Sequence, residues 1–361
     1  MQPAQFRAAA GRLDRFLGTL TPLLGRVERQ THASEYVRGL LLDGERALGK
    51  TANCQVAVSV HLGTDAACLP LTWGLYLPQA WIDDPVRRIA ARVPDDVRYQ
   101  TKNDLALAAL DRVRTWGVGT RVVLADAGYG TSHDFRAALT ARGLPYCVQV
   151  ASSVKGWTTA PPVAPPYAGY GRPRRRPHEA DIPPAHDLPT LAAALPATAW
   201  RTITWRAGTT GPLRSRFAAT AFWPAHGVRS RGPLPTTPVQ LLVEWPRSAS
   251  APTTYWLASL GEEALGLRRF VRLAKGRWRI EQDYRELKDE RGLDHFEGRS
   301  WPGWHHHVTL ASMAYAFLCS RPCAEKTARM TLPAIRRALQ VLLIRLGPWC
   351  PTCRRRWNDS S

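Results

Sequence analysis

The sequence is short of several features that define whole classes of protein. None of its apolar runs reaches the roughly 18 residues needed to cross a bilayer, and the stretch MQPAQFRAAAGRLDRFLGTL has neither the apolar core nor the cleavage site of a secretory signal. Acidic residues are also few, with 29 Asp and Glu against 49 Lys and Arg, for a formal net charge of +20. We therefore expect a cytoplasmic protein, with no membrane partner, that is drawn to polyanions such as nucleic acid.

Cysteine is too scarce, and odd in number, to supply a disulfide framework. Seven cysteines are spread over 361 residues, which is typical of an intracellular protein with buried or free thiols. Cys350 and Cys353 form a CxxC pair, and Cys319 and Cys323 precede it. These four thiols could on paper hold a tetrahedral zinc ion, but the loose spacing of the first pair favours core cysteines instead.

The first half of the chain changes from a helical to an alternating pattern. Residues 1–46 carry apolar side chains at spacings of three and four, which predicts helices. CQVAVSVHL, residues 54–62, and ACLPLTWGLYLP, residues 67–78, predict a β-hairpin with its turn at Gly63, Thr64 and Asp65. Helices and hairpin thus follow one another in sequence.

An α/β pattern follows the hairpin. We expect a helix over 102–116, a strand over 121–126, a helix capped by Ser132 and closed by Gly143, and a strand over 144–151. Strands that alternate with helices predict parallel pairing covered by helices. The fold class expected is α/β.

The second half is β-rich and then helical. A Pro- and Arg-rich passage with Arg172, Arg174, Arg175 and Arg176 is read as a solvated linker rather than a phosphate-binding loop. Strand patterns follow to about residue 260. We then expect one helix over 265–288, a second that begins at Ser300 and runs to 318, and a third through LPAIRRALQVLLIRLG.

The segment RWRIEQDYRELKDERGLDHFEGRSW, residues 277–301, places charged side chains at helical spacing. On a helix, Arg277, Glu281, Tyr284 and Lys288 share one stripe. A solvated face with weak ion pairs is the ordinary interpretation of such a pattern. That interpretation weakens because Asp126 ends a short apolar strand and precedes AGYG, at the edge where α/β sheets place their chemistry.

Two separated carboxylates in a basic chain suit the cleavage of phosphodiesters. Hard divalent ions, Mg²⁺ or Mn²⁺, bind carboxylate oxygens, activate a weak nucleophile and stabilise charge on the entering and leaving oxygens. Neighbouring Arg and Lys side chains can hold the phosphates. The residue types therefore fit metal-dependent phosphoryl transfer.

These residues resemble a known family. VVLADAGYG and RWRIEQDYRELKDERGLDHFEGRSW, together with GKTANCQVAVSVHL, LPLTWGLYLP, GPLRSRFAA and YWLASL, are similar to the IS701 group of the IS4-like DDE transposases. The wider group has a signature of Tyr, Arg, Glu and Lys. Arg277, Glu281 and Lys288 keep its spacing, whereas Ala274 stands at the Tyr position.

The resemblance implies an RNase H-like core with a β-rich insertion and helical N- and C-terminal regions. Asp126 and Glu281 would be catalytic and metal-binding, and Arg277, Tyr284 and Lys288 would contact DNA phosphate. Mg²⁺ or Mn²⁺ would be the cofactor. The partner would be double-stranded DNA at transposon ends and target, with a homo-oligomer or an intact transposase copy as a further partner near the nucleoid.

The same resemblance divides the chain into five parts. They are residues 1–50, a remnant of an N-terminal DNA-binding region; 51–152, the first part of the core; 153–264, the insertion with its Pro/Arg-rich loop; 265–320, core helices that carry the Glu; and 321–361, a helix and basic CxxC tail.

One expected element is missing. In the family the first catalytic Asp lies on the first strand of the sheet, before the GKTANCQVAVSVHL stretch, but here LLLDGER runs almost directly into KTANCQ. We infer an internal deletion near Arg46 and Ala47 that removes this strand. Asp43, Asp65, Asp83, Asp84, Asp95 and Asp96 do not end an apolar strand and are not expected to replace its Asp.

The deletion leaves two functions open. The chain is either a DDE transposase with impaired catalysis or a non-catalytic DNA-binding remnant. A zinc hydrolase built on His305, His306 and His307 is disfavoured, because consecutive side chains on a helix diverge by about 100° and cannot converge on one ion.

Overall fold

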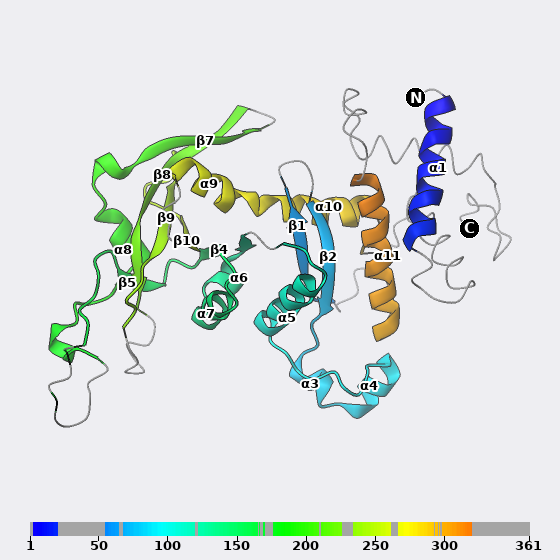
Figure 1. Ribbon diagram of the computed structural model, residues 1–361, viewed down its shortest axis with the longest axis horizontal. Helices are drawn as coiled ribbons and strands as arrows, with labels where there is room; N and C mark the ends of the chain where they lie inside the picture. Colours follow the sequence, from blue (N-terminus) through cyan, green and yellow to red (C-terminus); the bar gives the residue numbers. More distant parts are fainter. Residues whose placement is uncertain are drawn as a thin grey trace. The chain divides into compact units, whose positions relative to one another are not determined.

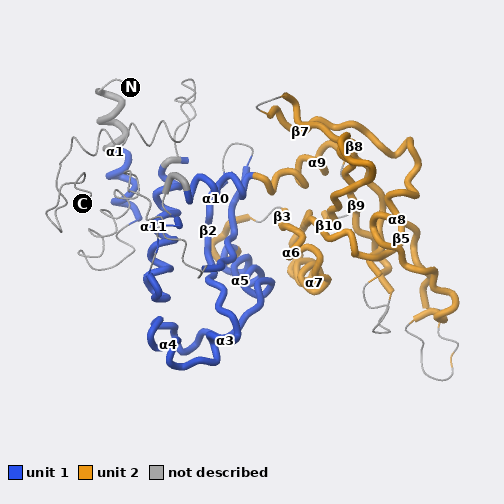
Figure 2. The backbone as a smooth tube through the Cα atoms, turned by 180° about the vertical axis from the view of Figure 1, so that it is seen from behind, with its two compact units in different colours: residues 1–113, 279–361 blue, residues 114–278 orange. Residues whose placement is uncertain are grey.

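The computed structural model describes most of the chain and divides it into two compact units. The described residues are 3–20, 55–64, 68–119, 122–164, 166, 169, 176–208, 211–225, 234–260, 266–291, 293–294, 296 and 298–319. The first unit comprises residues 1–113 and 279–361, and the second comprises residues 114–278 (Figure 2). Each unit is described by itself.

A mixed sheet forms the body of the second unit. In the described residues it has eight strands in the order β3-β4-β10-β9-β8-β5-β6, with β7 paired to β8 (Figure 1). The strands are β3 Val123–Ala125, β4 Tyr146–Val150, β5 Lys155–Trp157, β6 His186–Asp187, β7 Arg201–Gly208, β8 Gly211–Pro224, β9 Val239–Trp245 and β10 Thr254–Ser259. β3 and β4 are parallel, as the sequence predicts, and β10 lies antiparallel to β4. The strands of the expected insertion therefore extend the sheet that contains β3 and β4.

Helices pack on this sheet at places that the sequence marks. They are α6 Ala127–Gly130, α7 His133–Ala141, α8 Leu188–Ala193 and α9 Leu267–Gly276, with short 3₁₀ turns at Glu179–Asp181 and Ala197–Ala199. Ser132 caps α7 through its side chain, which accepts a hydrogen bond from the Phe135 amide at 3.3 Å. Gly143 follows with φ +64°, the left-handed conformation that glycine adopts without strain. Both predicted ends of this helix are confirmed.

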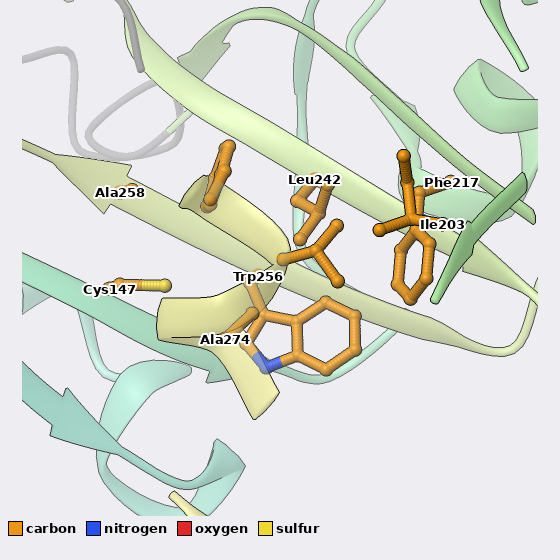
Figure 3. Close-up of a cluster of buried hydrophobic side chains, with 9 residues drawn as sticks. Cys147, Ile203, Phe217, Leu242, Trp256, Ala258 and Ala274 are labelled. Atoms are coloured by element: carbon orange, nitrogen blue, oxygen red, sulfur yellow. The ribbon is translucent and has the colours of Figure 1, made fainter. Parts of the chain in front are cut away.

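One hydrophobic cluster joins α9 to the sheet. Phe270, Val271 and Ala274 of α9 are buried against Trp256 and Leu242 of the central strands (Figure 3). Burial of aromatic and aliphatic side chains at this density contributes about 1.5–3 kcal/mol for each large residue. This contact fixes α9, and with it the start of the segment that leads to α10.

A buried ion pair fastens the same helix. The Lys275 ammonium lies 2.5 Å from Glu244 Oε2, and the two side chains are 22 % and 7 % exposed. The rings of Trp205 and Trp256 lie 4.8 and 5.1 Å from the ammonium. Aromatic faces attract a cation, so the charge of Lys275 is stabilised from several sides.

A two-stranded sheet and six helices form the described part of the first unit. They are α1 Pro3–Leu20, β1 Ala57–Gly63, β2 Cys68–Leu75, α3 Gln79–Ile82, α4 Pro85–Ala91, nearly all of α5 Lys102–Thr115, α10 Trp278–Arg291 from its second residue, and α11 Trp301–Cys319. β1 and β2 form the predicted antiparallel hairpin. α5 approaches β2 at Gly74, where an added Cβ would lie 3.4 Å from Leu105 Cδ2. Phe16 of α1 contacts Phe317 of α11, with ring centroids 5.5 Å apart.

The predicted helix over 265–288 is two helices. α9 ends at Gly276, Arg277 is its C-cap, and α10 begins at Trp278. A Cβ at Gly276 would lie 3.3 Å from Leu124 Cδ1, so the glycine allows the end of α9 to approach β3. Arg277 itself keeps right-handed helical dihedrals, with φ −56° and ψ −28°, so the division is an interruption of a single residue.

Several predicted features lie outside the described residues. They are the helical pattern beyond residue 20, the junction at Arg46 and Ala47, the turn residue Asp65, the third C-terminal helix, and the CxxC pair Cys350 and Cys353. Among the described helices, none is long and apolar enough to span a bilayer.

Replacement of Lys275 tests the importance of the ion pair. Lys275→Met leaves the Glu244 carboxylate buried without its cation, so we expect the free energy of unfolding to fall by about 3 kcal/mol in denaturant titrations. Arg268→Met removes an equal charge from an exposed position of the same helix, and this control should change stability by less than about 0.5 kcal/mol. Equal losses in the two variants would show that the pair does not stabilise the fold.

Candidate functional site

Asp126 lies where the sequence predicts, directly after β3. It is half-buried, and its Oδ1 accepts a hydrogen bond from the Gly128 amide at 2.9 Å, which caps the short helix α6. Within the described part of the chain, Oδ2 has no hydrogen-bond or ion-pair partner. The carboxylate therefore has one oxygen fixed and one available to a ligand.

The backbone that carries Asp126 is held firmly. A Cβ at Gly130 would lie 2.1 Å from Gln149 O, so only glycine allows α6 to lie on β4. Arg136, 5 % exposed, donates hydrogen bonds to the carbonyls of Gly130, Thr131 and Ser132. Burial lowers the pKa of this guanidinium from its ordinary value. The loop after Asp126 is thus fixed by its own neighbours.

Glu281 lies in the first turn of α10 and is exposed. Lys288 is exposed on the same helix. Arg277, the single residue between α9 and α10 in the sequence, is half-buried. Asp126 belongs to the second unit and Glu281 to the first. Their roles in metal binding, and those of Arg277 and Lys288 in phosphate binding, stay predictions.

The opposite face of α10 is anchored inside the first unit. Asp283 is 4 % exposed. Its Oδ2 accepts a hydrogen bond from His61 Nδ1 of β1 at 2.9 Å, and its Oδ1 accepts one from the Tyr315 hydroxyl of α11 at 2.9 Å. A buried carboxylate is costly unless it is paired, so these bonds hold the rotation of α10 about its axis.

Tyr284 takes part in this anchor. Its hydroxyl lies 2.5 Å from Ser59 Oγ, which lies 2.9 Å from His61 Nε2. The ring is half-buried, 5.8 Å from Trp73 and 5.5 Å from His61 between centroids. Its predicted contact with DNA phosphate stays untested, but the hydroxyl already has a partner in β1.

Burial also shapes the titration of the anchor. Burial, with a hydrogen bond to Asp283, holds the pKa of the Cys68 thiol above its usual range. The pKa of Tyr315 is likewise raised, chiefly by burial. Cys68 and Tyr315 therefore stay protonated at neutral pH and can act as donors to the buried carboxylate.

Sequence reasoning missed this anchor. Ser59 and His61 lie two residues apart on β1, and Asp283 lies two residues from Glu281 on α10. Neither local pattern indicates that His61 contacts Asp283. The available signal was the spacing itself, since residues two apart on a helix point to different faces. The spacing thus separates Glu281 from Asp283, but only the structure shows that Asp283 is the one that is buried.

The three consecutive histidines diverge, as expected. His305 is half-buried between Trp301 and Trp304, whose rings lie 4.4 and 4.8 Å from it between centroids, and burial lowers its pKa. His306 is exposed. His307 is 3 % exposed and its Nε2 lies 3.2 Å from the Leu293 carbonyl. They do not form a common metal site.

Comparison with known families gives one match. Residues 45–212 match the model of the DDE superfamily endonucleases. The match supports a DDE-type nuclease family. It covers β1, β2, β3 and Asp126, and it ends before Glu281. No curated protein matches the chain in sequence.

The glycine that allows α6 to lie on β4 can be tested directly. Gly130→Ala would force a Cβ into the Gln149 carbonyl, so we expect the free energy of unfolding to fall by more than about 2 kcal/mol. Gly128→Ala is the matched control, because its Cβ would meet only Asp126 Oδ1, at 3.1 Å, from an exposed position. Denaturant unfolding that ranks Gly128→Ala as the more harmful change would contradict the packing of α6 on β4.

Proposed function

We propose that the protein is a DNA-binding transposase of the DDE type, related to the IS701 group, whose strand cleavage is impaired by loss of the first acidic residue. The observation that carries the proposal is the match of residues 45–212 to DDE superfamily endonucleases, with Asp126 at the end of β3 inside the match. The net charge of +20 supports a polyanionic partner.

The carboxylates of Asp126 and Glu281 fit a hard divalent cation by their chemistry. Asp126 offers a carboxylate oxygen without a described partner, and Glu281 offers an exposed carboxylate. Mg²⁺ or Mn²⁺ bound to such oxygens would activate a water or hydroxyl nucleophile and stabilise the charge that develops on phosphate. Arg277 and Lys288 would hold the phosphates, and the Asp126 loop, braced by Arg136, would keep its carboxylate in place.

The pairing of the strands supports a lost first strand. β3 pairs with β4 on one side and with no described strand on the other, and β2 is the one described strand that pairs with β1. A strand edge left open in this way is what removal of a neighbouring strand would produce. Its loss would take with it the carboxylate that a complete metal site needs.

DNA binding is the part of the function that survives the deletion. We expect the logarithm of the association constant for double-stranded DNA to fall linearly with the logarithm of the salt concentration. The reason is that Lys and Arg side chains release counterions from the phosphates that they contact. Lys288→Ala should reduce the magnitude of the salt slope by about 1. Fluorescence anisotropy at several salt concentrations measures this slope.

The control for that measurement is Arg268→Ala, which removes an equal charge from an exposed position on α9. Equal slopes for Lys288→Ala, Arg268→Ala and the parent would remove Lys288 from the DNA contact. Binding that does not change with salt would count against the whole proposal.

Cleavage is tested with supercoiled DNA that carries the inverted repeats flanking the coding sequence, in Mg²⁺ or Mn²⁺. We expect little or no nicking by the parent chain, and no difference between it and Glu281→Gln or Asp126→Asn. Site-specific nicking that Glu281→Gln abolishes would show an intact active site and refute the impairment. DNA binding without any nicking would favour the non-catalytic alternative.

A further inference from the structure

A second cluster of metal-binding side chains lies in the first unit, apart from the acidic residues assigned above. His61 of β1, Cys68 of β2 and Asp283 of α10 each bring one donor atom, and these three atoms lie within 4.8 Å of one another. The side chains of His61 and Asp283 are 0 % and 6 % exposed, and Cys68 is 5 % exposed. Three elements thus converge on one buried point.

The chemistry of the donors selects the metal. A thiolate, an imidazole and a carboxylate together are the ligands that Zn²⁺ takes, whereas Mg²⁺ and Mn²⁺ prefer oxygen alone. One thiolate and one carboxylate also balance the two charges of the ion. A buried site of this composition is neutral, which removes the electrostatic cost of burying the carboxylate by itself.

Two of the three ligands, His61 and Asp283, are already oriented by hydrogen bonds from neighbouring groups. His61 Nε2 lies 2.9 Å from Ser59 Oγ, which leaves Nδ1 directed at the cluster. Asp283 Oδ1 accepts from the Tyr315 hydroxyl at 2.9 Å, which leaves Oδ2 directed at the same point. Hydrogen bonds from surrounding groups that fix the ligand atoms are a regular property of metal sites.

The spacing is close to that of a coordinated ion. Bonds of about 2.0–2.3 Å in a tetrahedron separate the ligand atoms by roughly 3.3–3.8 Å. His61 Nδ1 and Asp283 Oδ2 are 2.9 Å apart, joined by a hydrogen bond, and the longest separation in the cluster is within 4.8 Å. Rotations that move each atom by less than about 1 Å convert one arrangement into the other.

We propose that His61, Cys68 and Asp283 bind Zn²⁺. The Cys68 thiol proton leaves as the Zn–S bond forms. The proton that His61 Nδ1 donates to Asp283 is released as Nδ1 binds the ion, and Nε2 takes up one proton, which it donates to Ser59 Oγ. Water takes the fourth tetrahedral position. The ion joins the β1–β2 hairpin to α10 and so stabilises the helix that carries Glu281. This site is independent of the proposed DNA function.

Cobalt titration tests the proposal. The full chain is prepared with Cys54, Cys323, Cys350 and Cys353 replaced by Ser, which leaves the three described thiols Cys68, Cys147 and Cys319. We expect one Co²⁺ per chain with a thiolate-to-cobalt charge-transfer band. Zn²⁺ should displace it and raise the midpoint of thermal unfolding, because the ion binds the folded state.

Variants decide which thiol is responsible. In the same background, Cys68→Ser and His61→Gln should lose the band and bind Zn²⁺ more than about tenfold more weakly. Cys147→Ala is the matched control, since Cys147 is a buried thiol of the other unit. This variant should keep the charge-transfer band and the affinity for Zn²⁺. Should Cys68→Ser fail to unfold cooperatively, a band that persists in the chain with both Cys147 and Cys319 replaced by Ala assigns the thiolate to Cys68, the thiol that remains, and loss of that band contradicts the site.

Two outcomes would overturn the site. One is a parent chain that shows no charge-transfer band and no thermal shift at an excess of either metal. The other is Zn²⁺ binding of equal affinity in the parent and in Cys68→Ser, which would mark an adventitious ion. In both cases the cluster would be a hydrogen-bonded anchor without a metal.

Discussion

The buried carboxylate of Asp283 is the constraint on which the geometry of the first unit depends. A carboxylate that is 4 % exposed must find donors, and the donors come from β1 and α11 as well as from Cys68 of β2. Once these bonds form, rotation of α10 about its axis would leave the buried Asp283 carboxylate without its donors. The exposure of Glu281 and Lys288 on the same helix follows from this.

The second unit solves a related problem with different chemistry. α9 is held by apolar packing and by the pairing of Lys275 with Glu244, where aromatic rings surround the cation. The pairing of β10 with β4 makes the β-rich second half of the chain continuous with the strand next to β3. Asp126 therefore sits at the edge of a large sheet, on a loop that Arg136 and Gly130 make rigid.

Two kinds of metal chemistry can thus be told apart by their donor atoms. Asp126 and Glu281 offer carboxylate oxygen, which suits the Mg²⁺ or Mn²⁺ of a DDE-type nuclease. His61, Cys68 and Asp283 offer nitrogen, sulfur and oxygen in a buried cluster, which suits zinc. The first set is proposed for phosphoryl transfer and the second for the attachment of α10, so loss of one need not remove the other.

The sequence by itself determined many of the local elements, whereas the site residues that it indicates stay a prediction. Alternation predicted the β1–β2 hairpin, the Ser132 cap and Gly143 predicted both ends of α7, and the apolar run before Asp126 predicted the end of β3. These signals are local, because backbone conformation and capping depend on residues a few positions apart. Only the tertiary structure decided that β10 pairs with β4 and that the expected helix divides after Gly276. It also decided that His61 contacts Asp283, which lies 222 positions away in the sequence. Such contacts depend on which surfaces are buried together, and the spacing of residues along one segment carries no record of its distant partner.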